Sequence, residues 1–133
     1  MRRVTRRGGY VMALAEPDYL QRVDRPLSLV PAGRLQTAAL QRQGADPGLG
    51  PRLAGLFRQA GIEIIEAGQL QAAGVASIDG QAEWDVLEAD LAGMTSQAQL
   101  DEWKLIDRCA RAQGGRVLYV PTYFAFGRLA AGG

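Results

Sequence analysis

The chain has 133 residues, a formal net charge of +1 and a hydrophobic fraction of 47%. These values are typical of one globular domain and exclude general disorder. The sequence has no histidine and one cysteine, Cys109, which excludes Ser-His triads, Cys-His dyads, the usual zinc sites and an internal disulfide within these residues. We expect a cytoplasmic protein with no bound metal, no nucleic-acid partner and no membrane partner.

The first expected element is a strand at Tyr10–Ala15, which follows the turn signal Gly8-Gly9. Six mostly apolar residues between turn signals are typical of a strand buried on both faces. Arginines fill four of the first seven positions: Arg2, Arg3, Arg6 and Arg7. We interpret them as a solvated entry to the strand, with a phosphate-binding arm as the alternative.

Polar residues follow this strand at the sheet edge where α/β proteins place ligands. Glu16 and Asp18 are two carboxylates that could bind an amine, orient a hydroxyl or act as a base. We predict them as catalytic residues, with Tyr19 and Arg22 as substrate-binding residues nearby. The alternative is a solvated loop with capping carboxylates.

The middle of the chain predicts two helices and a second strand. Proline can occupy a first helical turn, and the pattern predicts a helix from about Pro31 to Gln43. A second helix begins near Pro51 and ends at Gly61, a residue suited to a C-terminal cap. The apolar face of this helix is formed by Leu49, Leu53, Leu56, Phe57 and Ala60. The isoleucine-rich segment from Ile62 to Leu70 predicts a strand.

Between these two helices, Asp46–Gly50 spells an acidic residue followed by G-x-G. A nucleotide-binding glycine loop has to leave a buried strand, so that backbone N–H groups meet the ligand at a helix N-terminus. The residues before Asp46 are polar and typical of a helix. We therefore interpret Asp46–Gly50 as a connection between helices.

The last third predicts a loop over Gln71–Gln81, two amphipathic helices and a third strand. The first helix carries Trp84, Leu87 and Leu91 on one face, and Thr95 or Ser96 can cap the second. The apolar stripe of the second helix consists of Leu100, Trp103, Ile106 and Ala110. Its polar residues, which include Asp107, are expected to lie mostly outside this stripe. We expect Cys109 to be a buried small hydrophobe.

The third strand begins at Val117 and bends at Pro121 before Tyr123–Phe126, and Leu129–Gly133 is expected to fray. Its aromatic residues are more typical of a core than of a binding platform. The complete order is strand, helix, helix, strand, two helices, strand. This alternation predicts a single α/β domain over residues 1–133.

Three segments in this order resemble class I S-adenosylmethionine-dependent methyltransferases. R-G-G-Y-V-M-A-L-A-E-P-D-Y (Arg7–Tyr19) resembles the region of strand five of that family. R-L-A-G-L-F-R-Q-A-G-I-E-I-I-E-A-G (Arg52–Gly68) is similar to its late helix and strand six. G-G-R-V-L-Y-V-P-T-Y-F-A-F-G-R (Gly114–Arg128) resembles its closing strand seven.

The resemblance implies a partial Rossmann-like sheet in the order five, seven, six, with strand seven antiparallel. It places Glu16, Asp18 and Tyr19 in the substrate half of the site, and Leu20–Gln43 in a substrate cover. The family's cofactor loop, an acidic residue with G-x-G-x-G after its first strand, has no counterpart in these residues. The resemblance therefore implies the C-terminal half of a methyltransferase, not expected to bind S-adenosylmethionine alone.

Three interpretations stay open. In the first, the complementary N-terminal half is on another polypeptide. The assembled enzyme would then methylate a small molecule, with Glu16 or Asp18 orienting the acceptor or taking its proton. In the second, the chain is a non-catalytic interaction module that pairs with itself or with another α/β chain along the strand Tyr10–Ala15. A third interpretation is a truncated gene model that starts at an internal Met1.

Overall fold

The computed structural model describes residues 3–71 and 80–130, which form two compact units. Unit 1 contains the described parts of Met1–Tyr19, Gly48–Gln71 and Pro121–Gly133. Unit 2 contains those of Leu20–Pro47 and Ala72–Val120. Each unit combines helix and strand, so the α/β class is confirmed.

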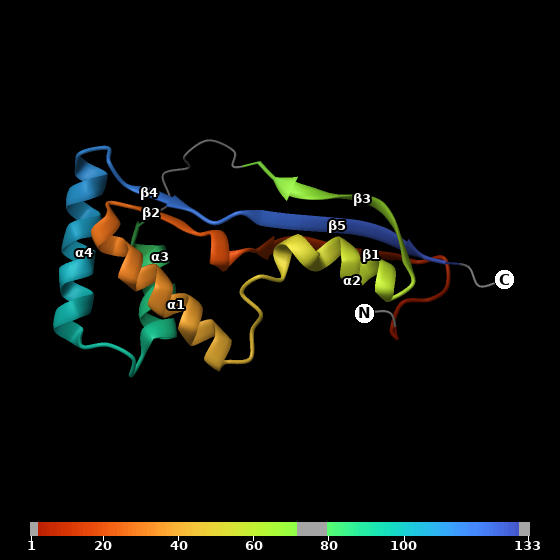
Figure 1. The fold of residues 1–133 in the computed structure, drawn as a ribbon, viewed down its shortest axis with the longest axis horizontal. Helices are drawn as coiled ribbons and strands as arrows, with labels where there is room; N and C mark the ends of the chain where they lie inside the picture. Colours follow the sequence, from red (N-terminus) through yellow and green to blue (C-terminus); the bar gives the residue numbers. More distant parts are fainter. Residues whose placement is uncertain (1–2, 72–79, 131–133) are drawn as a thin grey trace. The chain divides into compact units, whose positions relative to one another are not determined.

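Unit 1 is a three-stranded sheet with a short helix against it (Figure 1). Its strands are β1 (Tyr10–Pro17), β3 (Ile62–Leu70) and β5 (Thr122–Leu129), in the order β1-β5-β3. The central strand β5 is antiparallel to both neighbours. The helix α2 (Leu53–Gln59) follows the 3₁₀ turn Gly50–Arg52. The expected order of these three strands and the antiparallel last strand are therefore present, whereas the wider Rossmann-like sheet stays a prediction.

The core of unit 1 lies between α2 and one face of the sheet. It consists of Val11, Ala13, Leu53, Phe57, Ile62, Ala125 and Leu129. Strand β1 buries alternate residues only, because side chains point to opposite faces along a strand. Tyr10, Met12 and Leu14 are 61%, 50% and 62% exposed on its other side. The prediction of a strand buried on both faces was wrong, since in unit 1 α2 covers just one face.

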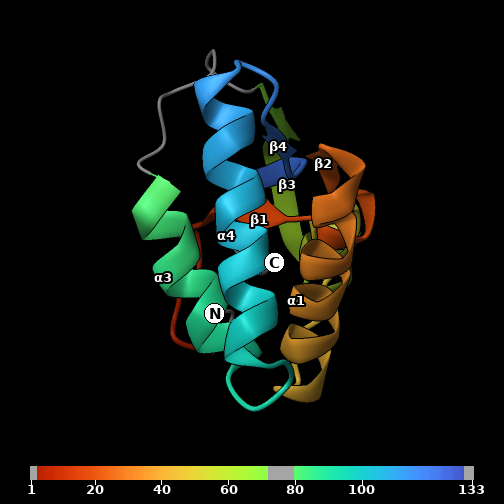
Figure 2. The ribbon, with the colours of Figure 1, turned by 90° about the vertical axis from the view of Figure 1, so that its left-hand side faces the viewer.

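Unit 2 has three helices and a two-stranded antiparallel sheet. The helices are α1 (Val30–Arg42), α3 (Gly80–Leu91) and α4 (Gln97–Ala112), and α3 contacts both α1 and α4 (Figure 2). The strands are β2 (Val23–Arg25) and β4 (Val117–Tyr119). The core consists of Leu29, Ala32, Trp84, Leu87, Leu91, Leu100 and Trp103. The expected helices and both tryptophans in the core are confirmed.

Local signals explain where the elements of both units end. Ser96 caps α4, because its Oγ accepts a hydrogen bond from the backbone N–H of Gln99 at 3.2 Å. Gly61 follows α2 with a φ of +71°, a conformation that glycine adopts without strain. These two positions confirm the expected cap and the expected helix end.

The third expected strand is in fact two strands in two sheets. Strand β4 pairs with β2 in unit 2, whereas β5 pairs with β1 and β3 in unit 1. Pro121 lies between them, and proline has no N–H to continue a ladder. The short strand β2 was not predicted, because three residues before a proline carry no clear alternation. Leu129 does not fray, since it ends β5 in the core.

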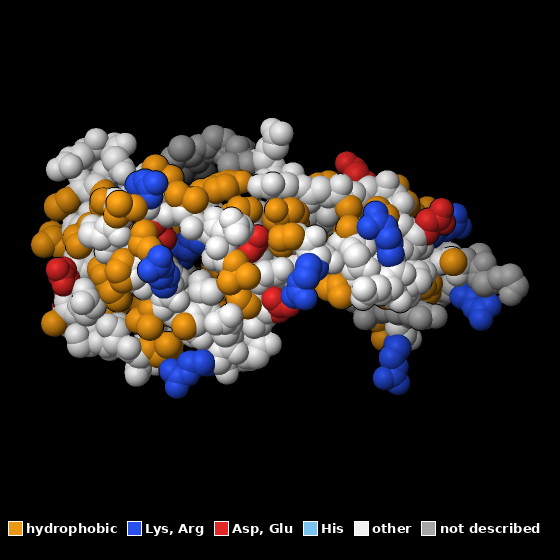
Figure 3. Space-filling model, viewed as in Figure 1, with side chains coloured by type: hydrophobic (Ala, Val, Ile, Leu, Met, Phe, Trp, Pro, Cys, Tyr) orange, Lys and Arg blue, Asp and Glu red, His pale blue; other side chains and the backbone are white. Residues whose placement is uncertain are grey.

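Cys109 is exposed rather than buried, because it lies one position away from the buried face of α4 at Ala110. Most of the expected loop Gln71–Gln81 lies outside the described residues, and its last two residues belong to α3. On the face drawn in Figure 3, side chains of both charges are scattered over the surface, in keeping with the net charge of +1.

Candidate functional site

The C-terminal end of β1 carries the predicted catalytic carboxylates. Glu16 lies opposite Tyr123 of β5, and the pairing register shifts between Ala13 and Glu16. Such a bulge re-aims the side chains that follow it, and bulges are common beside functional sites. The backbone N–H of Asp18 donates to the carbonyl of Pro121 at 2.7 Å, which fastens the residue to the start of β5.

The two carboxylates differ in their exposure. Asp18 is 4% exposed, whereas Glu16 is half-buried and therefore reachable by a ligand. Tyr19 is also half-buried and opens the 3₁₀ turn Tyr19–Gln21 (η1). Glu16, Asp18 and Tyr19 are thus brought together at one end of unit 1. A carboxylate in this position can accept a hydrogen bond or a proton from a bound molecule.

The loop before α2 packs tightly against this end of the sheet. A Cβ at position 50 would lie 2.6 Å from Cδ2 of Tyr123 and 2.8 Å from the carbonyl oxygen of Glu16. Contacts this short exclude a side chain, so Gly50 is required by packing. The segment Asp46–Gly50 connects α1 to the turn before α2, as predicted. It does not follow a strand, so it does not form a cofactor-binding glycine loop.

Arg22 lies in unit 2, and its guanidinium is held by unit 2 itself. Its Nε and Nη2 donate to the two carboxylate oxygens of Asp24 at 2.7 and 3.2 Å. Its Nη1 donates to Oε1 of Gln36 at 2.5 Å. A bidentate bond to a buried carboxylate fixes an arginine strongly. These contacts hold β2 against α1, and the substrate-binding role of Arg22 stays a prediction.

Asp24 and Arg22 belong to a larger buried network that the sequence interpretation did not identify. Arg116 donates to Asp24 at 3.0 Å and to Asp107 at 2.5 Å. Arg111 donates to Asp107 at 2.7 Å and to Glu83 at 2.5 Å. The network therefore ties β2 and the segment before β4 to α3 and α4.

A second branch of this network reaches α3 through α1. Gln36 donates to Oδ2 of Asp90 at 2.8 Å while it accepts from Arg22. A Cβ at position 33 of α1 would lie 2.6 Å from Oδ2 of Asp24. Gly33 therefore leaves the room that the Arg22–Asp24 pair occupies.

Asp107 is the most buried charge of the network, with 1% of its surface exposed. Burial alone would raise the pKa of its carboxyl, but hydrogen bonds from Arg111, Arg116 and Trp84 outweigh this cost and lower the pKa below its usual value. The hydrogen bond to Asp107 raises the pKa of Arg111, assisted by the charges of Asp107 and Glu83. Both residues are charged at neutral pH.

The network is a structural element of unit 2, because its polar groups are satisfied by one another. Among residues 3–71 and 80–130, no buried side-chain nitrogen or oxygen lacks a hydrogen-bond partner. One signal could have identified Asp107: it lies four positions after Trp103 and three before Ala110, on the buried stripe of α4. A charge on an apolar stripe indicates a buried ion pair.

Other kinds of site find no support in the described part of the chain. It contains no group of three or more His, Cys, Asp or Glu residues that could hold a metal ion. Its helices are too short or too polar to cross a membrane. No protein-family model matches the sequence, and no curated protein and no solved structure is significantly similar to it.

Proposed function

We propose that these residues contribute the substrate-side half of an S-adenosylmethionine-dependent methyltransferase. The observation that carries the proposal is the end of β1: a carboxylate accessible to ligands, Glu16, beside buried Asp18, next to a central antiparallel strand β5. This strand order is the one that the resemblance implies for the last three strands of the family sheet. The resemblance assigns a substrate-covering role to the segment Leu20–Gln43, which lies in unit 2.

The described residues do not fit S-adenosylmethionine by themselves. The only G-x-G after an acidic residue is Asp46–Gly50, and Gly50 is explained by its packing against Tyr123. The proposal therefore assigns cofactor binding to a complementary half outside these residues, which would extend the sheet along β1. The chain alone is expected to be inactive.

The proposed role of Glu16 follows from its position at the end of β1. Its carboxylate would accept a hydrogen bond from the hydroxyl or amine of a small acceptor, which orients the lone pair of the acceptor. Where the acceptor has to lose a proton, Glu16 would take it. Asp18, which is buried and fastened to Pro121, would position the strand end.

Affinity purification of the tagged chain from its native cells tests this proposal. We expect a retained partner whose sequence contains an acidic residue with G-x-G-x-G, and a complex that transfers labelled methyl groups from S-adenosylmethionine. Glu16→Gln should lower the transfer by about 10²-fold or more without lowering partner retention, as expected for loss of a general base. Glu63→Gln, an exposed carboxylate on β3, is the matched control and should leave the transfer unchanged.

Two results would refute the proposal. One is the absence of any partner with such a glycine loop. The other is a complex in which Glu16→Gln and Glu63→Gln transfer methyl groups as fast as the unmodified chain.

A further inference from the structure

One edge of β1 has no neighbouring strand. Strand β1 pairs with β5 along one edge, and no strand among residues 3–71 and 80–130 pairs along the other. Its first six residues, Tyr10–Ala15, contain neither a charge nor a proline. Natural edge strands usually carry such residues, because an unprotected edge offers backbone donors and acceptors to another chain.

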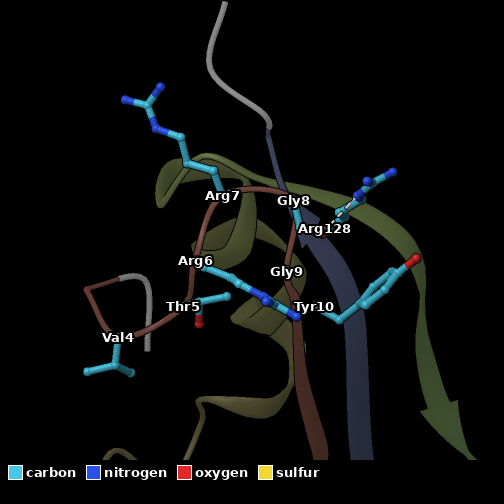
Figure 4. A pocket seen from close by; sticks show the side chains of 8 residues that line it. All are labelled: Val4, Thr5, Arg6, Arg7, Gly8, Gly9, Tyr10 and Arg128. Carbon is cyan, nitrogen blue, oxygen red and sulfur yellow. Dashed lines mark hydrogen bonds between the residues drawn. The ribbon is translucent and has the colours of Figure 1, made fainter.

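The two ends of this edge carry opposite charges. Arg6 and Arg7 lie in the turn that precedes β1, and Glu16 lies at its other end. Figure 4 shows the side chain of Arg6 extending beside Gly9 and Tyr10 at the start of the strand. Neither arginine, nor Glu16, makes an ion pair with another residue in the described part of the chain.

We propose that the isolated chain forms a twofold homodimer in which two β1 edges pair antiparallel. A closed symmetric pairing of identical edges has to be antiparallel, because the same surface meets itself across a twofold axis. This direction places Arg6 and Arg7 of one copy at the Glu16 end of the other copy. A parallel pairing would set arginine against arginine and glutamate against glutamate, which is unfavourable.

The dimer is a continuous six-stranded sheet in the order β3-β5-β1-β1-β5-β3. The bulge between Ala13 and Glu16 limits the regular ladder to the first part of β1, since a bulge disrupts regular pairing. Tyr10 is already held there: its ring stacks on Phe126 at 5.4 Å, and the guanidinium carbon of Arg128 lies 5.9 Å from its centre. Pairing would bring the exposed Tyr10 and Met12 of both copies side by side.

This inference concerns unit 1 alone and does not depend on methyl transfer. The same edge cannot pair with a complementary enzyme half and with a second copy at once. The homodimer is therefore the state of the chain without that half, and it would have to open before the larger sheet could form.

Light scattering coupled to size-exclusion chromatography, over a series of protein concentrations, tests the dimer. We expect a particle of twice the 14.3 kDa chain mass. Two variants should each weaken dimerisation about tenfold, because attraction becomes repulsion at both symmetric contacts. One is Glu16→Arg, and the other combines Arg6→Glu with Arg7→Glu. Arg58→Glu, an exposed arginine on α2, is the control and should leave the dimer unchanged.

Charge exchange makes the test specific for the antiparallel direction. A chain that combines Glu16→Arg with Arg6→Glu and Arg7→Glu should dimerise like the unmodified protein, because each contact again joins opposite charges. Circular dichroism of every variant checks that it is folded. A monomer at all concentrations, a dimer indifferent to these charges, or a combined variant that stays monomeric would each overturn the proposal.

Discussion

Asp107→Asn is the most informative single change for the architecture of unit 2. The substitution keeps the size of the side chain but removes the charge that two guanidinium groups share. In the folded protein, Asp107 accepts from Nε of Arg116 at 2.5 Å and from Nε of Arg111 at 2.7 Å. An asparagine can accept one of these bonds with its oxygen, but its amide nitrogen would face the other donor.

The structure sets the size of the effect. A hydrogen bond to a charged group contributes about 1.5–3 kcal/mol, and breaking a buried pair by removing one partner costs about 3–5 kcal/mol. Arg116 keeps its second partner Asp24, and Arg111 keeps Glu83, so neither guanidinium is left alone. We therefore expect the free energy of unfolding of unit 2 to fall by about 2–4 kcal/mol, less than the upper limit for breaking a buried pair.

Tryptophan fluorescence during urea unfolding measures this loss, because Trp84 and Trp103 are the two tryptophans of the chain and both lie in unit 2. The matched control is Glu88→Gln, which removes a partly exposed ion pair with Lys104. Such a pair contributes about 0–1 kcal/mol. Equal losses for Asp107→Asn and Glu88→Gln would refute the view that the network holds unit 2 together.

Further changes test other parts of the structure. The Asp107 pKa is lowered in the folded state, so its stabilising contribution is complete above the unfolded value of 3.8 and is lost as the pH falls through the folded value. The difference in stability between the unmodified protein and Asp107→Asn should therefore narrow as the pH falls below about 4. An unchanged difference in acid would contradict the assignment. Gly50→Ala should destabilise unit 1 by about 1–3 kcal/mol, since its Cβ would meet Tyr123 and the Glu16 carbonyl. Gly55→Ala in α2 should stabilise unit 1 by about 0.5–1 kcal/mol, because a Cβ at this position would meet nothing within 4 Å. Amide hydrogen exchange of β5 measures the effect of both glycine substitutions, and effects of the same sign would count against the packing role of Gly50. Ser96→Ala should cost unit 2 about 1 kcal/mol in the urea assay through loss of the α4 cap, and an unchanged midpoint would show that the cap contributes nothing.

Local sequence signals predicted most helices and strands, because residues within or next to each element determine where it forms. The strand at Ile62–Leu70 is rich in β-branched residues, and its predicted bounds are those of β3. Ser96 and Gly61 marked a helix start and a helix end through hydrogen bonding and backbone conformation. The resemblance added the position of the last strand in the sheet, which periodicity alone does not give.

The errors arose where long-range pairing decides the structure. The run from Val117 to Phe126 reads as one bent strand, but its two halves pair in different sheets. Strand β2 is three residues long and exists because β4 lies beside it. Apolar content could not show that β1 is covered on one face only, since that depends on where α2 packs.

The candidate site was predictable in part. Position after an apolar strand identified Glu16, Asp18 and Tyr19, which the structure places at one end of unit 1. Closeness in sequence suggested Arg22 as well, but its guanidinium bonds Asp24 and Gln36 in unit 2. The distant partner Arg116 had no local signal, because it meets Asp24 across 92 positions of sequence.

The binding of S-adenosylmethionine to the purified chain, measured by isothermal titration calorimetry, bears on the proposed half-enzyme without any partner in hand. A chain that supplies the substrate side and lacks the cofactor loop should give no measurable heat of binding. Tight, saturable binding by these 133 residues alone would contradict the account, because it would require a cofactor site within units 1 and 2.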